Sequence, residues 1–234
     1  MDKENYHMIK YIHEGPKALR ETLKANDLAV REIGKAFRKR EIERIIITGL
    51  GSSYTAAVMA KPLFDVSLNI PMLVSNSEEV AYFQEQWVNE KSLVVAVSRS
   101  GERESVVEVI KAANRLGAFG VAITGVADSL LAHNSNLTLI TQEGPEITFP
   151  KTKSVLAGAG LLMRLGLELS NVSDQMSHKR RSELEEIPEI ITKTIAQIDP
   201  QIRGLMSWVK DLKYLNVVGT CSNYGVALEA AVKV

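Results

Sequence analysis

The chain has 234 residues, of which 45% are hydrophobic, so it is long enough to bury one or two cores. Its 28 Lys and Arg residues balance 28 Asp and Glu residues, which leaves no net field to attract nucleic acid or an anionic membrane. A single cysteine, a polar N-terminus and the lack of a membrane-length apolar run predict a cytoplasmic protein without disulfides.

Apolar segments alternate with helical patterns along the chain. Apolar residues at helical spacing predict a leading helix from Pro16 to about Lys39, which we expect to cap the core. Strands separated by helices predict an α/β fold: a doubly wound, parallel, five-stranded sheet with helices on both faces, as in a flavodoxin-like three-layer sandwich. The five predicted strands lie at residues 44–48, 71–75, 93–97, 120–124 and 136–141.

The segment from about Thr152 to Leu169 is apolar on nearly every side and is predicted to be a helix. Such a helix must be buried, between domains or at a subunit interface, and we expect both, which predicts a homodimer. Polar residues from 171 to 181 indicate a linker. Charged helical sequence then runs to about Lys213 and is followed by a predicted strand at residues 214–218.

The last predicted strand begins a repeat. Residues 219–224 (GTCSNY) match residues 49–54 (GLGSSY) at an offset of 219 − 49 = 170. A unit with one strand and part of one helix cannot close a core of its own. We therefore predict four segments: a helical lead-in at 1–40, a complete first domain at 41–170, a helical linker at 171–213 and the truncated start of a second domain at 214–234.

The predicted strand at residues 93–97 leads directly into the hydroxyl-rich turn SRSGER at residues 98–103 and then into a helix. The first N–H groups of a helix have no partner and carry partial positive charge. Serines and a glycine let the backbone approach an anion closely, and Arg99 and Arg103 can add charge-assisted hydrogen bonds. The turn therefore predicts a phosphate site at the carboxyl end of a parallel strand, where open α/β sheets bind their ligands.

Four segments together resemble the sugar isomerase (SIS) domain family, especially the isomerase half of glutamine–fructose-6-phosphate aminotransferase and stand-alone sugar-phosphate isomerases and deaminases. They are the lead-in at 14–23 (EGPKALRETL), the turn at 51–54 (GSSY), the turn at 98–102, and GPEI leading to TK within residues 144–153. The likeness covers nearly the whole chain, and it implies an SIS fold and a phosphorylated sugar as the ligand.

In that family the first turn binds the sugar and the second turn binds the phosphate. The residues to which the resemblance gives a substrate-binding role are Gly51, Ser52, Ser53, Ser98, Arg99, Ser100, Arg103, Thr152 and Lys153.

Structural interpretations of these residues remain open beside the functional ones. Ser52 or Ser53 can serve only as a helix N-cap, and the serines at 98 and 100 can serve only to form the turn. Arg103 can be a solvated charge on a helix face, and Lys153 can stabilise the start of its helix by packing.

Three positions depart from the family pattern. The family often has a neutral amide at the position of Arg99, a threonine at Arg103 and a serine at Lys151. Extra cations should strengthen anion binding, so the departures put in question whether the substrate is the common hexose phosphate.

Interconversion of an aldose and a ketose needs a base that moves a proton between adjacent carbons. In the resembling family this carboxylate lies in a Lys-x-x-Glu pattern on the first helix of the second domain. Glu229 and Lys233 match positions just upstream, so the base itself is expected beyond Val234. The same two residues, spaced i,i+4, also fit an ordinary helix ion pair worth about 0.2–0.5 kcal/mol.

We therefore expect an isomerase or deaminase of a sugar phosphate, in particular an amino-sugar phosphate, with this chain as the phosphosugar-binding half. A non-catalytic sugar-phosphate sensor and a deglycase of sugar-phosphate amine adducts are the alternatives. No metal is expected because the four histidines lack paired spacing, and no cofactor is expected because Gly49-x-Gly51 lacks the full dinucleotide fingerprint.

Overall fold

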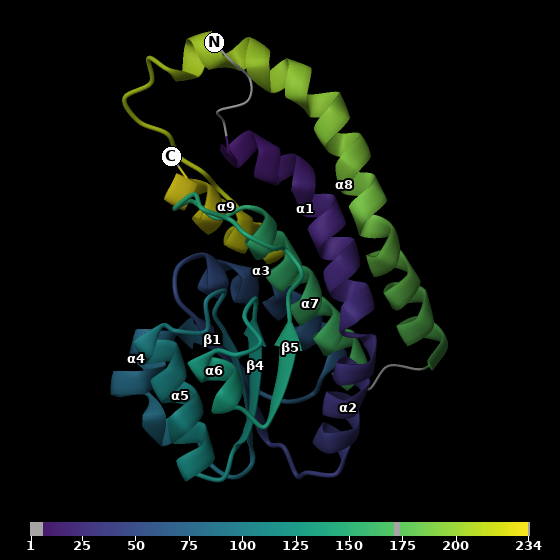
Figure 1. Ribbon diagram of the computed structural model, residues 1–234, viewed down its shortest axis with the longest axis vertical. Coiled ribbons are helices and arrows are strands. Elements are labelled where there is room, and N and C mark those ends of the chain that lie inside the picture. Colours follow the sequence, from purple (N-terminus) through teal and green to yellow (C-terminus); the bar gives the residue numbers. More distant parts are fainter. Residues whose placement is uncertain (1–6, 171–173, 234) are drawn as a thin grey trace.

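The computed structural model describes residues 7–170 and 174–233. Five parallel strands form one sheet in the order β2-β1-β3-β4-β5, which confirms the predicted doubly wound sheet (Figure 1). In this register Ile47 of β1 lies between Val74 of β2 and Val95 of β3. The strand bounds are Arg44–Gly49 (β1), Met72–Asn76 (β2), Ser92–Val97 (β3), Phe119–Thr124 (β4) and Leu137–Ile140 (β5).

Helices cover both faces of the sheet. One face packs against α2, α3 and α7, and the other face packs against α4, α5 and α6. Because β3 and β4 are buried on both faces, they are apolar without alternation. The helices are α1 (His7–Ala25), α2 (Asp27–Arg38), α3 (Ser52–Ser67), α4 (Ser77–Phe83), the 3-10 turn η2 (Glu85–Trp87), α5 (Glu104–Arg115), α6 (Leu130–His133), α7 (Lys153–Leu169), α8 (Asp174–Val209) and α9 (Ser222–Lys233).

The strand order reverses between β1 and β3. From β1 the chain moves to β2 on one side, and from β3 it moves to β4 and β5 on the other side. Open α/β sheets bind ligands outside the carboxyl ends of the strands at such a reversal. The strand ends beside it are Gly49 and Val97, and the turns that follow them lead into α3 and α5.

The predicted single leading helix is wrong, because the structure has two helices that meet at Asn26. The Asn26 side chain donates to the Ile140 carbonyl at 2.8 Å and accepts from the Ile140 N–H at 2.8 Å. It therefore pairs with the edge strand β5 as a neighbouring strand would. Helical spacing of apolar residues continues through this position, so the sequence pattern gave no sign of the break.

The predicted burial of α7 is confirmed, but its own chain supplies the cover. α1 and α3 lie along α7, and α2 and α8 also contact it (Figure 1). Small residues allow this close packing, since Gly160 faces Leu19 of α1 and Gly166 faces Phe64 of α3. The reason for which we predicted a homodimer is thereby removed, and the dimer itself stays a prediction.

The C-terminal part differs from the prediction at residues 214–218. Helix α8 begins at Asp174 within the predicted helical linker, and residues 171–173 lie outside the described residues. The strand predicted at 214–218 does not form, because no described strand lies beside it to complete its hydrogen bonds.

The sequence repeat is visible in the backbone. Gly51 (φ 56°) and Cys221 (φ 51°) lie 221 − 51 = 170 residues apart, and each has a positive φ directly before a helix. The two helices, α3 and α9, pack against each other (Figure 1). The contact is close at Gly225, where a Cβ would overlap Met59. The domain boundaries themselves stay predictions.

Candidate functional site

The first turn at the strand reversal leads from β1 into α3. Its N-cap residue is Gly51, which has a positive φ of 56° and no side chain to cap the helix. Ser53 lines a cavity beside the turn. Ser52 also lines it, but the Ser52 hydroxyl donates to Glu229 at 2.8 Å. Among the described residues no side chain caps the start of α3, although the Ser53 N–H donates to the Leu50 carbonyl at 3.2 Å.

The second turn leads from β3 into α5. Ser98 is buried, and its hydroxyl accepts from the Gly101 N–H at 3.2 Å, while the Ser100 hydroxyl accepts from the Glu102 N–H at 3.3 Å. Both serines thus shape the turn through their side chains. Within the described part of the chain, no hydrogen bond uses the N–H groups of Arg99 and Ser100.

Gly101 fixes the shape of this turn. Its φ of 69° is left-handed, and a Cβ there would overlap the side chain of Ser129, the residue that caps α6. The next helix, α5, begins without a side-chain cap at its N-cap residue Arg103. Arg103 is exposed and does not line the cavity, so the structure separates it from the other predicted site residues.

The cavity lies between α3 and α7 over the carboxyl ends of β3 and β4. The space open to water is about 40 Å³, and a single water needs roughly 10–15 Å³ in this measure, so the cavity accepts a group of anion size. Its polar lining residues are Ser52, Ser53, Arg99, Thr124, Thr141, Lys151 and Ser154.

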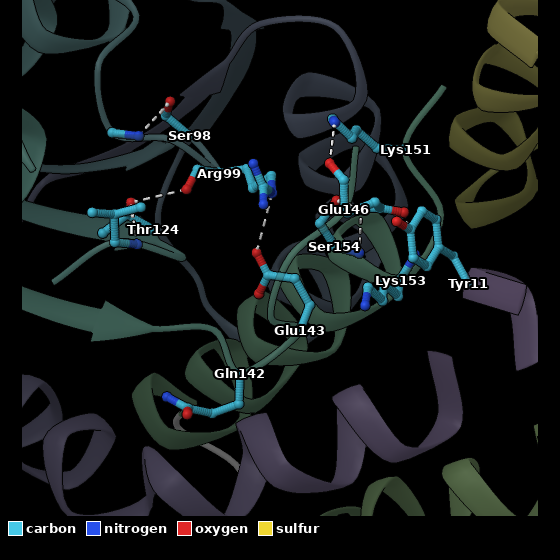
Figure 2. Close-up of polar contacts among 12 residues, drawn as sticks. Tyr11, Ser98, Arg99, Thr124, Gln142, Glu143, Glu146, Lys151, Lys153 and Ser154 are labelled. Atoms are coloured by element: carbon cyan, nitrogen blue, oxygen red, sulfur yellow. Dashed lines mark hydrogen bonds and ion pairs between the residues drawn. The ribbon is translucent and has the colours of Figure 1, made fainter. Parts of the chain in front are cut away.

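Two cations from different loops line this cavity. Figure 2 shows the Arg99 side chain pointing away from Ser98 and toward Glu143, which follows β5. The Arg99 Nε lies 3.7 Å from a Glu143 carboxylate oxygen, beyond hydrogen-bond distance. Lys151 approaches from the loop before α7 and donates to two backbone carbonyls, those of Glu146 at 2.9 Å and Thr148 at 2.6 Å. Burial, followed by the positive charge of Arg99, lowers the pKa of the Lys151 ammonium.

The N-terminus of α7 is occupied by a carboxylate of the chain itself. Glu146 accepts from the N–H groups of Thr152 (2.6 Å), Lys153 (3.2 Å) and Ser154 (3.3 Å), and from the hydroxyls of Thr152 (2.8 Å) and Ser154 (2.6 Å). Burial by itself raises the pKa of Glu146, but these hydrogen bonds outweigh it and lower the pKa below the ordinary value. Thr152, a predicted site residue, thus donates both its N–H and its hydroxyl to Glu146.

Lys153 and the helix α9 contribute contacts of another kind. The Lys153 ammonium pairs with Glu14 at 2.6 Å and lies over the Tyr11 ring, so it joins α7 to α1 outside the cavity. The Glu229 carboxylate accepts from Ser52, from Thr55 and from Lys233, which connects α9 to the start of α3. The structure therefore brings Glu229 to the predicted sugar turn.

Sequence reasoning missed several cavity residues. Thr124 is the last residue of β4 and Thr141 directly follows β5, while Glu143, which pairs with Arg99, stands two residues beyond Thr141. The place of the two threonines at the ends of predicted strands was a usable signal, because parallel strand ends share one edge of the sheet. Lys151 was noticed as a departure from the family pattern and not as a site residue.

Among residues 7–170 and 174–233, no group of three His, Cys, Asp or Glu side chains is arranged to hold a metal ion. Over the same ranges no helix is both long enough and apolar enough to cross a membrane. The fold and the rim define an open α/β protein with an anion-sized cavity at its strand reversal.

Comparisons with known proteins agree with this architecture. A family model described as SIS domain matches residues 39–164, more than half of the chain. The isomerizing glutamine–fructose-6-phosphate aminotransferase of Thermococcus kodakarensis is 30% identical over 230 residues, which cover 97% of this chain and 38% of that protein. The C-terminal domain of glucosamine–fructose-6-phosphate aminotransferase from Francisella tularensis superposes with a TM-score of 0.84 at 25% identity, over 100% of this chain and 68% of that one.

A further solved structure shares the fold. Tagatose-6-phosphate ketose/aldose isomerase from Escherichia coli superposes with a TM-score of 0.68 at 18% identity, over 98% of this chain and 63% of that one. The chain belongs to the SIS domain family. It spans 38% of the length of the aminotransferase relative from Thermococcus kodakarensis.

Proposed function

We propose that this chain is the phosphosugar-binding half of an isomerase or deaminase that acts on an amino-sugar phosphate. The observation that carries the proposal is the pair of helix N-termini at the strand reversal, α3 and α5, neither of which has a side-chain cap. The names of the aminotransferase and isomerase relatives support the same class of substrate.

The phosphate is assigned to the turn at residues 98–103. The N–H groups of Arg99 and Ser100 and the start of α5 supply donors and partial positive charge, which suit an anion. The hydroxyls of Ser98 and Ser100 hold the turn in this shape. The sugar then extends toward Ser53 and the open start of α3.

Isomerisation needs a base that moves a proton between adjacent carbons of the sugar, and we propose that this base lies outside the phosphate turn. Glu229 is the carboxylate beside the sugar turn, but it already accepts hydrogen bonds from Ser52, Thr55 and Lys233. Both oxygens of this carboxylate are therefore already engaged by donors of the chain itself. We therefore assign Glu229 and Lys233 to positioning α3 and do not assign the base to either of them. Activity of the whole protein is part of this proposal.

Binding is tested by calorimetry on the 234-residue chain, titrated with glucosamine 6-phosphate, fructose 6-phosphate, the unphosphorylated sugars and inorganic phosphate. We expect the phosphorylated sugars to bind and their unphosphorylated forms not to bind. Ser100→Asp places a negative charge in the phosphate turn and should weaken binding at least about tenfold, by repulsion. Ser207→Asp, on an exposed position of α8, is the matched control and should bind as the wild type does.

Turnover is tested separately on the protein that contains this chain, with the same sugar phosphates and with sugar-phosphate amine adducts. Isomerisation or deamination supports the proposal, and cleavage of the adducts supports a deglycase. Binding with no turnover of any of them would support the regulatory module instead.

Assembly and location complete the proposal. We propose that the protein forms a homodimer. We also propose that it lies in the cytoplasm, a location consistent with the proposed sugar-phosphate chemistry. Light scattering that gives the mass of a single chain at every concentration would contradict the dimer. Fractionation that recovers the protein with membranes would contradict the location.

A further inference from the structure

The Arg99 side chain leaves the turn to which its backbone belongs. The Arg99 carbonyl accepts from the Gly125 N–H at 2.9 Å, so the backbone of this residue is fixed against the end of β4. Figure 2 shows the side chain pointing away from Ser98 and toward Glu143. The side chain therefore lines the cavity that Ser53 also lines, where the proposed sugar extends, and points away from the phosphate turn.

This direction is not the one that a phosphate in the turn would favour. Arginine side chains bind phosphate strongly, often through two parallel hydrogen bonds. Within the described part of the chain, no hydrogen bond uses a guanidinium N–H of Arg99, so no bond to the chain ties these donors down. The force that holds the guanidinium off the turn is therefore an electrostatic attraction from the other side of the cavity.

Glu143 is the group that exerts this attraction. Its side chain is 2% exposed, and one carboxylate oxygen lies 3.7 Å from the Arg99 Nε, which is its sole ion pair among the described residues. The other carboxylate oxygen is buried and accepts no hydrogen bond from those residues. Because a buried carboxylate needs a compensating charge, Glu143 attracts Arg99 more strongly than a solvated carboxylate would.

The chain leaves room for this carboxylate at the edge of the sheet. A Cβ at residue 125 would lie 2.5 Å from the Glu143 Oε1, so the carboxylate occupies space that Gly125 leaves free. Gly125 directly follows β4 and Glu143 lies in the segment after β5, and these two strands are neighbours in the sheet. The position of the carboxylate is thus fixed by two adjacent strand ends.

We infer that Glu143 is a positioning residue, which holds the Arg99 guanidinium in the sugar part of the site and away from the phosphate turn. At 3.7 Å the pair is held by charge and not by a hydrogen bond, so the guanidinium N–H groups can donate to oxygens of the sugar. The inference rests on the proposed function, because it takes the phosphate to bind at residues 98–103. It assigns Arg99 to recognition of the sugar and leaves the phosphate to the backbone N–H groups of the turn.

The test compares two ligands by calorimetry at constant ionic strength. The first is fructose 6-phosphate or glucosamine 6-phosphate, whichever binds the wild type more tightly. The second is inorganic phosphate, which fits only the turn and is measured by its competition with the sugar phosphate. Arg99→Gln should weaken the sugar phosphate about tenfold and leave phosphate nearly unchanged, since the lost charge-assisted hydrogen bonds go to the sugar. Glu143→Gln should strengthen phosphate about tenfold, because the released guanidinium can then reach the turn.

The double variant Arg99→Gln/Glu143→Gln separates positioning from a general effect of charge. If Glu143 acts through Arg99, the gain in phosphate affinity disappears in the double variant. If removal of a negative charge acts through space, the gain persists. The double variant also lacks the buried unpaired carboxylate that Arg99→Gln alone would leave, so it serves the test even where that single variant is unfolded.

Two further variants sharpen the result. Gly125→Ala keeps the charge of Glu143 but takes its space, so it should act in the same direction as Glu143→Gln. Asp128→Asn removes an exposed carboxylate from the loop after β4 and is the matched control, so it should leave the ratio of the two affinities unchanged. Thermal unfolding checks that each variant is folded.

The outcomes separate the two proposals. A gain in phosphate affinity that persists in the double variant overturns this inference and leaves the proposed function standing. Phosphate that competes no better in Glu143→Gln than in the wild type also overturns it. Failure of both sugar phosphates to bind the wild type contradicts the proposed function itself.

Discussion

Among the described residues, one helix follows each of the five strands at the carboxyl edge of the sheet (α3, α4, α5, α6 and α7), and these helices differ in what meets their first N–H groups; α6 is capped by the Ser129 hydroxyl. At α7 the Glu146 carboxylate accepts from three backbone N–H groups, and at α4 the Asn76 side chain accepts from the Glu78 N–H at 3.0 Å. At α3 and α5 no side chain of the N-cap residue serves in this way. The helices that lack a cap follow β1 and β3, the strands on either side of the reversal.

The difference between these helices shows at which N-termini a bound anion can take the place of a side-chain cap. A helix N-terminus that already holds an internal carboxylate gains little from a phosphate, because its donors are used. An uncapped N-terminus gives up the roughly 0.5–2 kcal/mol that a cap supplies, and a bound anion can restore it. Capped helices therefore stabilise the fold, and uncapped helices remain available for binding.

Gly101→Ala is expected to have the largest effect on stability, because it distorts the turn before α5. The left-handed backbone and the overlap with Ser129 should together lower the free energy of unfolding by about 2–4 kcal/mol. Gly144→Ala is the control, since Gly144 is also left-handed (φ 65°) but has open space around it, and it should cost only about 1–2 kcal/mol. Urea unfolding of both variants measures the difference, and equal losses would contradict the role of Ser129.

Glu146→Ala should uncap α7 and make it resemble α5. Loss of the buried acceptor should lower the free energy of unfolding by about 2–3 kcal/mol. Sulfate should then raise the melting temperature of the variant more than that of the wild type, because a free anion can occupy the vacated N-terminus. Glu102→Ala, which removes a single acceptor from an exposed residue, is the control. An equal response to sulfate in all three proteins would contradict the comparison.

The pH dependence of stability should report the cap of α7. The pKa of Glu146 is lower in the folded chain than its ordinary value of 4.5, so the charged cap stabilises the fold fully above that value. This contribution is lost as the pH falls from about 4.5 through the lower folded pKa. Glu146→Gln should flatten this part of the curve of unfolding free energy against pH. A curve that falls as steeply in the variant would assign the acid sensitivity to other groups.

Asn76→Ala should give the smallest effect. It removes the cap of α4, away from the reversal, and should lower the free energy of unfolding by about 1 kcal/mol. Because α4 takes no part in the proposed site, affinity for sugar phosphates should stay the same in calorimetry. Weaker binding by this variant would show that the capped helices also shape the site.

The sequence predicted the sheet well because its signals are local. Each strand is a short apolar run, and the helix between two strands forces a parallel connection, so the five strands and their direction followed from the pattern. The break at Asn26 and the missing strand at 214–218 were not predictable in this way. Both depend on a partner far away in the chain: Ile140 for the first, and a neighbouring strand for the second.

The site was predicted in part for the same reason. The turns at 51–54 and 98–103 carry their own signal, since glycine and serine follow a buried strand in each. What each side chain does there is not local information. Lys153 reaches Glu14 of α1, and Arg99 turns toward Glu143 after β5, contacts that bridge 139 residues in the first case.

By itself, the sequence determined the α/β class, the parallel sheet and the two turns at its edge, because strand burial, helical periodicity and glycine-containing turns act over a few residues. The tertiary structure decided which helix starts are capped and which are open, and which cations meet in the cavity. Those choices depend on hydrogen bonds and charges between segments that approach one another only after the sheet has formed.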